Sequence, residues 1–414
     1  MLMSELRHAA RDPRPLPSVI AAARPVIANI LERALAGREL SFEDGLCLLG
    51  ADGPDLTAVI RTADYVRSVD VGPVITYVIN RNINFTNICF VGCEFCAFAR
   101  HRKDADARTD KIEDVLVKVQ DAVDLGATEI CMQGGINPDM DAFIYRDTLL
   151  AIKARFPTLH IHAFSPMEIM YGSRRTGMPY VEYIGMLKDA GLDTIPGTAA
   201  EILDDDVREI LSHKKVDVRT WVDIITTAHR LGIPTTSTIM YGHIERPEHI
   251  VRHVQLIRSI QQDTGGFTEF VPLRFIHTHT ALYRKGLVTP PPMGLLDLRL
   301  YAFSRLMLRG QIDNLQTSWV KLGEDLAQLT FVAGVNDFGG TLMEEQITKS
   351  AGGEAGEYIP ADRIRALIEQ AGRKPQQRTT TYGRVCTEAP HRAGDSAGWG
   401  SWRGTLAAGP QLPS

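Results

Sequence analysis

The sequence predicts an α/β protein whose core is a TIM-like (β/α)8 barrel, complete or partial. From Gly72 onward, short runs of β-branched residues alternate with amphipathic stretches, as in successive βα units around a parallel sheet. The segments that begin at Gly126, Gly191 and Gly232 resemble one repeated unit, in which a glycine ends a helix and a strand follows. Eight such units would close a barrel, and six would leave a partial one.

About eight segments have the composition of strands. They are residues 74–85, 128–134, 159–164, 192–196, 234–241, 267–273, 314–320 and 331–337. Amphipathic spacing predicts helices over residues 111–125, 141–156, 181–190 and 218–231. The chemistry of a barrel takes place at the C-terminal ends of its strands, so polar residues at those ends are the candidates for function.

Three regions are expected along the chain. Residues 1–70 should form a helical extension that packs on the barrel, with Ser41-Phe-Glu-Asp as one helix start. Residues 71–384 should form the barrel itself. Residues 385–414 are rich in Gly, Ala, Pro, Ser and Arg, and their few large apolar side chains cannot offset the ordering entropy, so we expect a disordered tail.

Composition favours small-molecule substrates. The chain has 45 basic and 50 acidic side chains and a formal net charge of -5, so no strong positive field would attract it to nucleic acid or an anionic membrane. Its apolar runs are shorter than the roughly 18 residues of a membrane span, so we expect a cytoplasmic protein. Six cysteines in 414 residues are too few for a disulfide scaffold.

Three of these cysteines, Cys89, Cys93 and Cys96, crowd into a loop after the first predicted strand. Thiolates are soft ligands for iron and zinc, and a loop this short can wrap one polynuclear centre. Three ligands on a four-iron cube leave one iron open to the amino and carboxylate groups of a small molecule. A structural zinc site with His101 as the fourth ligand, or a non-catalytic iron–sulfur protein, is the alternative.

The pattern C-x-x-x-C-x-x-C, with Phe95 before the last cysteine, resembles the signature of the radical S-adenosylmethionine (SAM) superfamily. Beyond the cysteines, residues 74–382 are similar to the CofH-type 4-hydroxyphenyl transferases of deazaflavin coenzyme biosynthesis. The segments that carry this resemblance are 80–87, 131–138, 160–169, 193–203, 235–243 and 264–273. It implies two cofactors, a four-iron, four-sulfur (4Fe-4S) cluster on the three cysteines and S-adenosyl-L-methionine.

The family reaction implied by this resemblance breaks the Cα–Cβ bond of L-tyrosine. A 4-hydroxybenzyl fragment adds to 5-amino-6-(D-ribitylamino)uracil, and 2-iminoacetate, methionine and 5'-deoxyadenosine leave. The product is a precursor of the 7,8-didemethyl-8-hydroxy-5-deazariboflavin chromophore of coenzyme factor 420. The implied partners are a low-potential electron donor, such as flavodoxin or ferredoxin, and a separate ring-closing synthase, because the chain has one cysteine cluster.

The resemblance also implies residues around the cofactor. The glycine-rich end of the second strand would approach the methionine amino group, the fifth-strand element would pack on the adenine, and an acid after the fourth strand would reach the ribose. The candidate cofactor-binding residues are Phe95, Gln133, Gly134, Gly135, Glu201, Met240, Gly242 and Glu245. Ordinary turn chemistry is the alternative at each position.

Several histidines and carboxylates fall near predicted strand ends, where they could hold tyrosine or the uracil. The candidate catalytic residues are His162, Glu168, His243 and Glu269, and Asp337 has a similar predicted position. His160 and His162 alternate along one strand, so a pocket-lining pair is expected in preference to a second metal site. His249 and His253 have a metal-compatible i, i+4 spacing, but a solvated helix face is the expectation there.

The stretch after the sixth strand departs from the family pattern. Arg274 stands where proline is expected, and Thr278 and His279 stand where the pattern is apolar or acidic, so substrate placement could differ. Aminofutalosine synthase and the dehypoxanthine futalosine cyclase of menaquinone biosynthesis share the cysteine spacing and the Thr-Gly-Gly-Phe segment. The Met-Gln-Gly-Gly-Ile and Pro-Gly-Thr-Ala-Ala-Glu-Ile stretches favour the tyrosine-dependent transferase.

Overall fold

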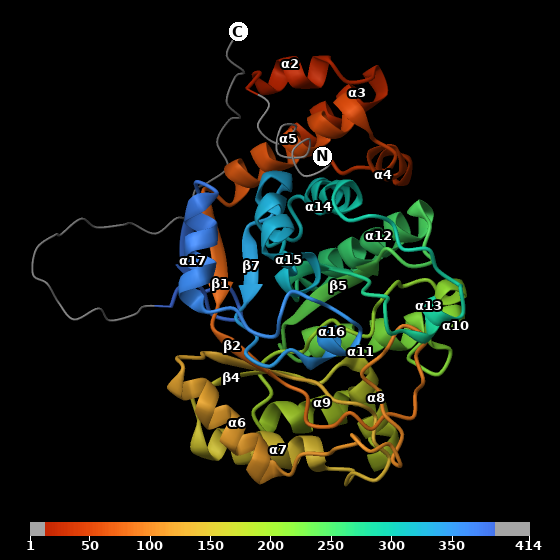
Figure 1. Cartoon of the computed structure of the whole chain (residues 1–414), viewed down its shortest axis with the longest axis vertical. Coiled ribbons are helices and arrows are strands. Elements are labelled where there is room, and N and C mark those ends of the chain that lie inside the picture. The colour runs from red at the N-terminus through yellow and green to blue at the C-terminus, as the bar shows by residue number, and fades with distance from the viewer. Residues whose placement is uncertain (1–12, 386–414) are drawn as a thin grey trace, which may run out of the picture. The chain divides into compact units, whose positions relative to one another are not determined.

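Four helices precede the first strand in the computed structural model, which describes residues 13–385. They are α2 (Leu16–Ala21), α3 (Pro25–Leu35), α4 (Phe42–Leu49) and α5 (Gly53–Asp70). The start of α4 is the predicted one, because the Ser41 hydroxyl accepts a hydrogen bond from the Asp44 amide and the Asp44 carboxylate accepts one from the Ser41 amide. Figure 1 shows these helices in red and orange, with α4 and α5 packed against α14 (Leu295–Met307).

Eight strands follow α5 among the described residues. They are β1 (Val74–Val78), β2 (Asn80–Ile83), β3 (Glu129–Met132), β4 (His160–Ala163), β5 (Thr235–Tyr241), β6 (Phe267–Arg274), β7 (Asp337–Gly340) and β8 (Lys374–Gln377). All pairings between these strands are parallel. β1 and β2 together form the extended segment predicted as the first strand, and its two halves pair with different neighbours.

Short bridges complete the ring of strands. β1 pairs with β7, β2 with β3, β3 with β4, and β5 with β6. Residues 194–195 bridge β4 to β5, and residues 315–316 bridge β6 to β7. The ring therefore runs through residues 74–83, β3, β4, 194–195, β5, β6, 315–316 and β7, which are the eight positions of the predicted barrel.

Helices alternate with these strands and lie around them (Figure 1). They are α6 (Ile112–Asp124), α7 (Ile144–Arg155), α8 (Pro166–Thr176), α9 (Tyr180–Asp189), α10 (Asp205–Ser212), α11 (Val218–Arg230), α12 (Pro247–Thr264), α13 (Ala281–Arg284), α14, α15 (Trp319–Leu329), the 3-10 helix η1 (Thr330–Ala333), α16 (Gln346–Ser350) and α17 (Ala361–Gln370). Gly126, Gly191 and Gly232 have positive φ two residues after α6, α9 and α11, so the predicted helix stops are confirmed. No helix among residues 13–385 is both long and apolar enough to cross a lipid bilayer.

Three predicted strands need correction. Residues 192–196 contribute only bridges at Thr194 and Ile195, and Pro196 has no amide hydrogen to continue a ladder. Residues 314–320 likewise keep only two bridging residues, because α15 begins at Trp319. Residues 331–337 are mostly the end of η1 and a turn at Gly334, which has a φ of 94°, so Asp337 begins β7 and does not end a strand.

The sequence analysis missed β8, whose Lys-Pro-Gln-Gln segment lacks the apolar alternation of a strand. It pairs with β1 along residues 74–77 and directs the following turn toward the barrel interior. The expected tail, residues 385–414, lies outside the described residues except for Val385. The boundary between residues 1–70 and 71–384 stays a prediction.

Candidate active site

The three clustered cysteines line one cavity of about 430 Å³. Their loop follows β2, at the C-terminal end of the first barrel strand, as predicted. Backbone contacts shape it: the Cys96 amide donates to the Cys93 carbonyl over 3.1 Å, and the Cys89 amide donates to the Arg100 carbonyl over 3.1 Å. The cavity also reaches residues of β3, β4, β6 and the turn after β8, so the cysteines occupy one end of a larger chamber.

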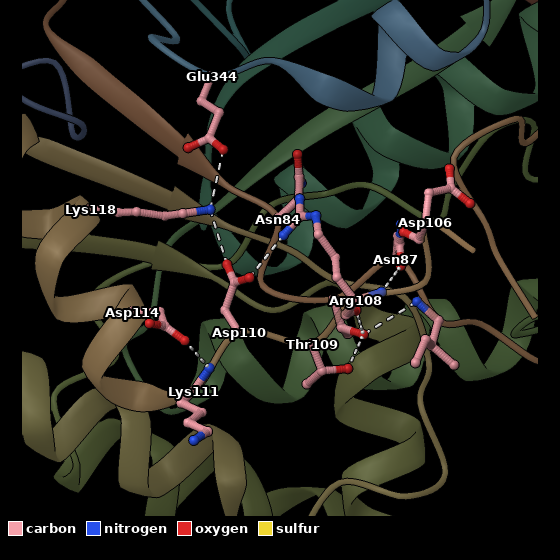
Figure 2. A network of polar contacts seen from close by, with 12 residues as sticks. Asn84, Asn87, Asp106, Arg108, Thr109, Asp110, Lys111, Asp114, Lys118 and Glu344 are labelled. Carbon is pink, nitrogen blue, oxygen red and sulfur yellow. Dashed lines mark hydrogen bonds and ion pairs between the residues drawn. The ribbon is translucent and has the colours of Figure 1, made fainter. Parts of the chain in front are cut away.

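A polar clamp ties the residues after the cysteines back to Thr86 and Asn87, which lie just after β2, as Figure 2 shows. The Asn87 side chain donates to the Asp106 carbonyl and accepts from the Arg108 amide, both over 2.8 Å. The Thr86 hydroxyl donates to the Arg108 carbonyl over 2.9 Å and lies 2.8 Å from the Thr109 hydroxyl. Thr86 and Asn87 therefore fix the cysteine loop by satisfying backbone groups of residues 106–108, where the chain leaves the loop.

Ion pairs extend this clamp to the C-terminal part of the chain (Figure 2). The Lys118 ammonium contacts Asp110 over 3.0 Å and Glu344 over 3.2 Å. The Arg81 guanidinium from β2 also contacts Glu344, over 2.8 Å. The segment after β7 is thus anchored to the strand and helix that flank the cysteine loop.

The donor set fits an iron–sulfur cluster. Burial raises the pKa of the Cys93 thiol to about 12, Lys215 opposes this shift, and neighbouring Cys96 and Cys89 add to it, so the three sulfurs lie within electrostatic reach of one another. The described side chains include no group of three or more His, Cys, Asp or Glu arranged to hold a single metal ion. His101 is exposed and does not line the cavity. Three thiols around a cavity, with space for a small molecule beside them, match a cluster with an open iron.

The glycine pair after β3 is required by close packing under the cysteine loop. An added Cβ at Gly135 would lie 2.3 Å from the Ile88 carbonyl oxygen, and one at Gly134 would lie 2.7 Å from the Phe85 ring. Both glycines and Gln133 line the cavity. The Gln133 side chain accepts a hydrogen bond from the Thr198 hydroxyl over 3.1 Å, which links β3 to the loop after residues 194–195.

Glu168 lies behind this glycine pair and off the cavity wall. One of its oxygens accepts from the Gly134 amide over 3.0 Å, and the other accepts from the Ser165 amide and hydroxyl over 2.7 and 2.6 Å. Burial raises the pKa of Glu168 to about 7. Its carboxyl therefore joins the end of β3 to the start of α8 and acts on the cavity through Gly134.

Glu201 is paired with two cations beside the cysteines. The Lys215 ammonium lies 2.6 Å from one Glu201 oxygen, and the Arg208 guanidinium lies 3.4 Å from the other. Burial alone would lower the pKa of Lys215, but the carboxylate of Glu201 and the Cys93 sulfur raise it. Lys215 also lies 5.1 Å from the centre of the Phe95 ring. Glu201, Lys215 and Phe95 all line the cavity.

Sequence reasoning missed Lys215 and Arg208. Lys215 follows His213 and Lys214, a charged run that reads as a solvated surface, and Arg208 lies in the polar helix α10. Their burial depends on the left-handed backbone at Ala199 and Glu201, whose φ values are 62° and 42°. Nothing in the sequence marks this turn except its Gly-Thr-Ala-Ala-Glu composition.

The end of β5 and the turn after it contain four of the candidate residues. Met240 lines the cavity, whereas Gly242, His243 and Glu245 lie behind it. The Glu245 carboxylate accepts from the Gly242 amide over 2.5 Å and from the His243 amide over 2.8 Å. Burial lowers the pKa of His243, whose ring contacts the Met240 carbonyl over 2.9 Å. These residues hold the turn that places Met240.

The part of the cavity wall formed by β4, β6 and the turn after β8, which we call the far wall, carries the other candidates, His162 and Glu269. His160 and His162 both contact the Thr194 hydroxyl, over 2.8 and 2.7 Å, but only His162 lines the cavity. Burial lowers the pKa of His162 to about 4, so it is neutral at physiological pH. Glu269 is the third residue of β6 and does not lie at its end, because β6 extends to Arg274.

One expectation outside the cavity is wrong. His249 and His253 do not form a solvated helix face, since they are 7% and 0% exposed. The His253 ring accepts a hydrogen bond from the Leu203 amide over 3.0 Å, so it caps the loop before α10.

Arg274, at the departure from the family pattern, lines the cavity and forms a buried ion pair with Asp297 over 2.6 Å, whereas His279 is exposed.

Comparison with known proteins gives two family matches. Residues 83–257 match the radical SAM superfamily, and residues 264–390 match the CofH/MqnC C-terminal region. The 5-amino-6-(D-ribitylamino)uracil–L-tyrosine 4-hydroxyphenyl transferase of Methanothermobacter thermautotrophicus is 48% identical, over 86% of this chain and 97% of that protein. The FO synthase of Streptomyces avermitilis is 50% identical over 87% of this chain, which spans 42% of that longer protein.

Solved structures support the fold. Methylornithine synthase (PylB) superimposes with a TM-score of 0.63 at 16% identity, covering 84% of this chain and 97% of that chain. HydG, a maturase of the FeFe-hydrogenase, superimposes with a TM-score of 0.68 at 16% identity, covering 92% and 81%. At this identity the likeness concerns the barrel fold alone.

Proposed function

Because the chain belongs to the radical SAM superfamily, in its CofH-type branch, we propose that it transfers the 4-hydroxybenzyl group of L-tyrosine to 5-amino-6-(D-ribitylamino)uracil. The observation that carries this proposal is the 48% identity to the archaeal transferase along 97% of its length. The Cα–Cβ bond of tyrosine breaks and its Cβ becomes bonded to the pyrimidine, while the Cα and nitrogen leave as 2-iminoacetate. One S-adenosylmethionine is consumed, giving methionine and 5'-deoxyadenosine.

The superfamily uses a 4Fe-4S cluster and S-adenosylmethionine, and in this chain Cys89, Cys93 and Cys96 would hold the cluster. A bound cluster supplies the electron that cleaves S-adenosylmethionine. Lys215 places a buried positive charge next to the cysteine sulfurs and would offset part of the negative charge of three thiolates.

We propose that S-adenosylmethionine binds at the cysteine end of the cavity. We assign the cavity-lining members of the candidate set, which are Phe95, Gln133, Gly134, Gly135, Glu201 and Met240, to direct contact with S-adenosylmethionine. Gly242 and Glu245 would act through the turn that places Met240. Of the candidate catalytic residues, His162 and Glu269 face the cavity and would touch substrate, whereas Glu168 and His243 would act as positioning residues.

Two partners belong to this proposal. A low-potential protein such as flavodoxin or ferredoxin would deliver the electron to the cysteine end. The archaeal relative, of which this chain covers 97%, is named for the transfer step alone. We therefore propose that a separate synthase closes the deazaflavin ring.

The test is anaerobic reconstitution with iron and sulfide, followed by reduction with S-adenosylmethionine, L-tyrosine and the ribitylaminouracil. Mass spectrometry should detect both 5'-deoxyadenosine and the hydroxybenzyl adduct. The CofH/MqnC match makes a futalosine cyclase the second candidate. Uncoupled 5'-deoxyadenosine without adduct, together with turnover of dehypoxanthine futalosine, would favour that second candidate.

A further inference from the structure

The turn after β8 forms part of the far wall of the cavity. Arg378 is 3% exposed, and its guanidinium lies 4.1 Å from the centre of the Tyr382 ring. The Arg378 amide donates to the Tyr77 carbonyl over 2.8 Å, which continues the pairing of β8 with β1. Arg378 and Thr380 line the cavity, so this C-terminal turn supplies wall that the barrel strands leave open.

Two carboxylates face Arg378, and their hydrogen bonds differ. Both oxygens of Asp337 are occupied, by the Arg378 guanidinium over 2.5 and 3.0 Å, by the Thr76 hydroxyl and by the Gly339 amide. Glu269 uses only Oε2, which accepts from the Gln316 amide over 3.1 Å and from the Tyr382 hydroxyl, with Arg378 3.5 Å away. Asp337 therefore anchors Arg378.

Glu269 Oε1 has no hydrogen-bond partner among the described residues, and it is not one of their fully buried unpaired atoms. Glu269 lines the cavity, so this oxygen is open to it. An acceptor held in place on one side and open on the other is suited to a ligand that presents an N–H or O–H group.

We propose that Glu269 Oε1 accepts a hydrogen bond from the pyrimidine substrate, and that Tyr382 and Gln316 are positioning residues that hold Glu269 for this contact. This inference rests on the proposed function. The turn after β8 thereby becomes a substrate-binding element, although it lies more than one hundred residues after Glu269 in the chain.

The chemistry of the far wall favours the pyrimidine over tyrosine. Besides His162 and Glu269, the polar side chains that line the cavity outside the cysteine loop include Gln316, Lys321, Glu345, Thr348, Arg378 and Thr380. A uracil ring with an amino group and a sugar-alcohol chain offers many neutral donors and acceptors to such a surface, whereas L-tyrosine offers one hydroxyl besides its charged α-amino and α-carboxylate groups. The cysteine end, where bond cleavage begins, would then be left to the cofactor and tyrosine.

The test measures binding without turnover. Reconstituted, unreduced holoenzyme with S-adenosylmethionine is titrated with the ribitylaminouracil and, separately, with L-tyrosine by isothermal calorimetry. Glu269→Gln should weaken pyrimidine binding about tenfold or more, as expected for loss of a charge-assisted hydrogen bond, and Tyr382→Phe should weaken it about three- to tenfold. Tyrosine binding should stay within about twofold of the wild-type value.

Tyr77→Phe is the matched control, because it removes a tyrosine hydroxyl that contacts Arg365 over 3.0 Å, away from the cavity. Its pyrimidine affinity should equal the wild-type value. In turnover assays, Tyr382→Phe should raise the KM for the pyrimidine by a larger factor than it lowers kcat.

Two outcomes would overturn this inference: pyrimidine affinity that is unchanged in both variants, or a loss of tyrosine affinity with pyrimidine affinity unchanged. If the wild type makes the adduct in either case, the proposed function stands. Wild-type holoenzyme that binds no pyrimidine would overturn the proposed function as well.

Discussion

The two ends of the cavity are built in different ways. The cysteine end comes from loops close together in the sequence, residues 84–99 and 133–136, joined by the Glu201 and Lys215 pair. The far end gathers single side chains from β3, β4, β6, residues 316–321 and the turn after β8. A local loop leaves a recognisable spacing in the sequence, whereas a wall assembled from distant strands does not.

The two ends also differ in how they hold charge. At the cysteine end, one carboxylate has two cations, Lys215 and Arg208, and these lie beside thiols that would become negative. At the far end, one cation, Arg378, faces two carboxylates, and burial raises the pKa of Glu269 to about 7. The first arrangement suits an anionic ligand set, and the second leaves an acceptor for a neutral donor.

The prediction with the largest expected effect concerns the cysteine end, where we expect S-adenosylmethionine to be cleaved. Cys96→Ala should abolish cluster loading and S-adenosylmethionine cleavage, because two thiolates cannot hold a four-iron cluster firmly. Iron and sulfide content and 5'-deoxyadenosine formation are the measurements. Cys47→Ala is the control, since Cys47 lies in α4 and does not line the cavity, and it should behave as wild type.

The second prediction concerns the ion pair beside the cysteines. Lys215→Met leaves Glu201 without its closer cation and should cost about 3–5 kcal/mol of unfolding free energy, as for other broken buried pairs. Urea denaturation of the apoprotein measures this cost. The double variant Lys215→Met with Glu201→Gln should regain much of the stability, and a double variant as unstable as the single one would contradict the pairing.

The third prediction concerns backbone packing under the cysteine loop. Gly135→Ala places a Cβ 2.3 Å from the Ile88 carbonyl oxygen, so the loop must shift, at a cost of about 1–3 kcal/mol and with reduced iron loading. Gly185→Ala is the control, because a Cβ there meets no atom within 4 Å on helix α9. Its stability should be unchanged or slightly higher.

Sequence reasoning found the barrel, the cysteine loop and the glycines at the helix ends, because each follows from local spacing or backbone conformation. It predicted Gly134 and Gly135 as a close-approach site for cofactor, and the structure adds that they pack under Phe85 and Ile88. The strand ends were less predictable. Asp337 begins β7 after the turn at Gly334, a shift that no periodicity in residues 331–337 indicates.

The far wall could not be predicted for a different reason. Arg378 and Tyr382 follow a polar strand, β8, that pairs only because β1 offers a free edge over residues 74–77. Tyr382 lies three residues before the segment predicted to be a tail. A side chain whose partner is more than one hundred residues away in the chain has no local signature, so only the fold reveals that it contacts Glu269.

The smallest expected effect is a pH dependence at the far end. Glu269 faces Arg378 and Tyr382 from the turn after β8, Asp337 from β7 and Glu129 from β3, and its pKa is raised to about 7 by burial. The carboxylate is the better acceptor, so pyrimidine binding should weaken by several-fold as the pH falls from 8 to 6, and Glu269→Gln should remove this dependence. Calorimetric titrations at each pH measure both.

The same raised pKa has a consequence for stability with the opposite pH trend. The folded state favours the protonated form of Glu269. The contribution of this group to the unfolding free energy is therefore fully present below the ordinary pKa of 4.5 and is lost as the pH rises through about 7. Glu269→Gln should therefore gain stability relative to wild type over that range in urea denaturation. If the unfolding free energies of the two proteins changed equally with pH, Glu269 would ionise as readily in the folded protein as in the unfolded chain. The far wall would then lack the perturbed carboxylate that distinguishes it from the cysteine end.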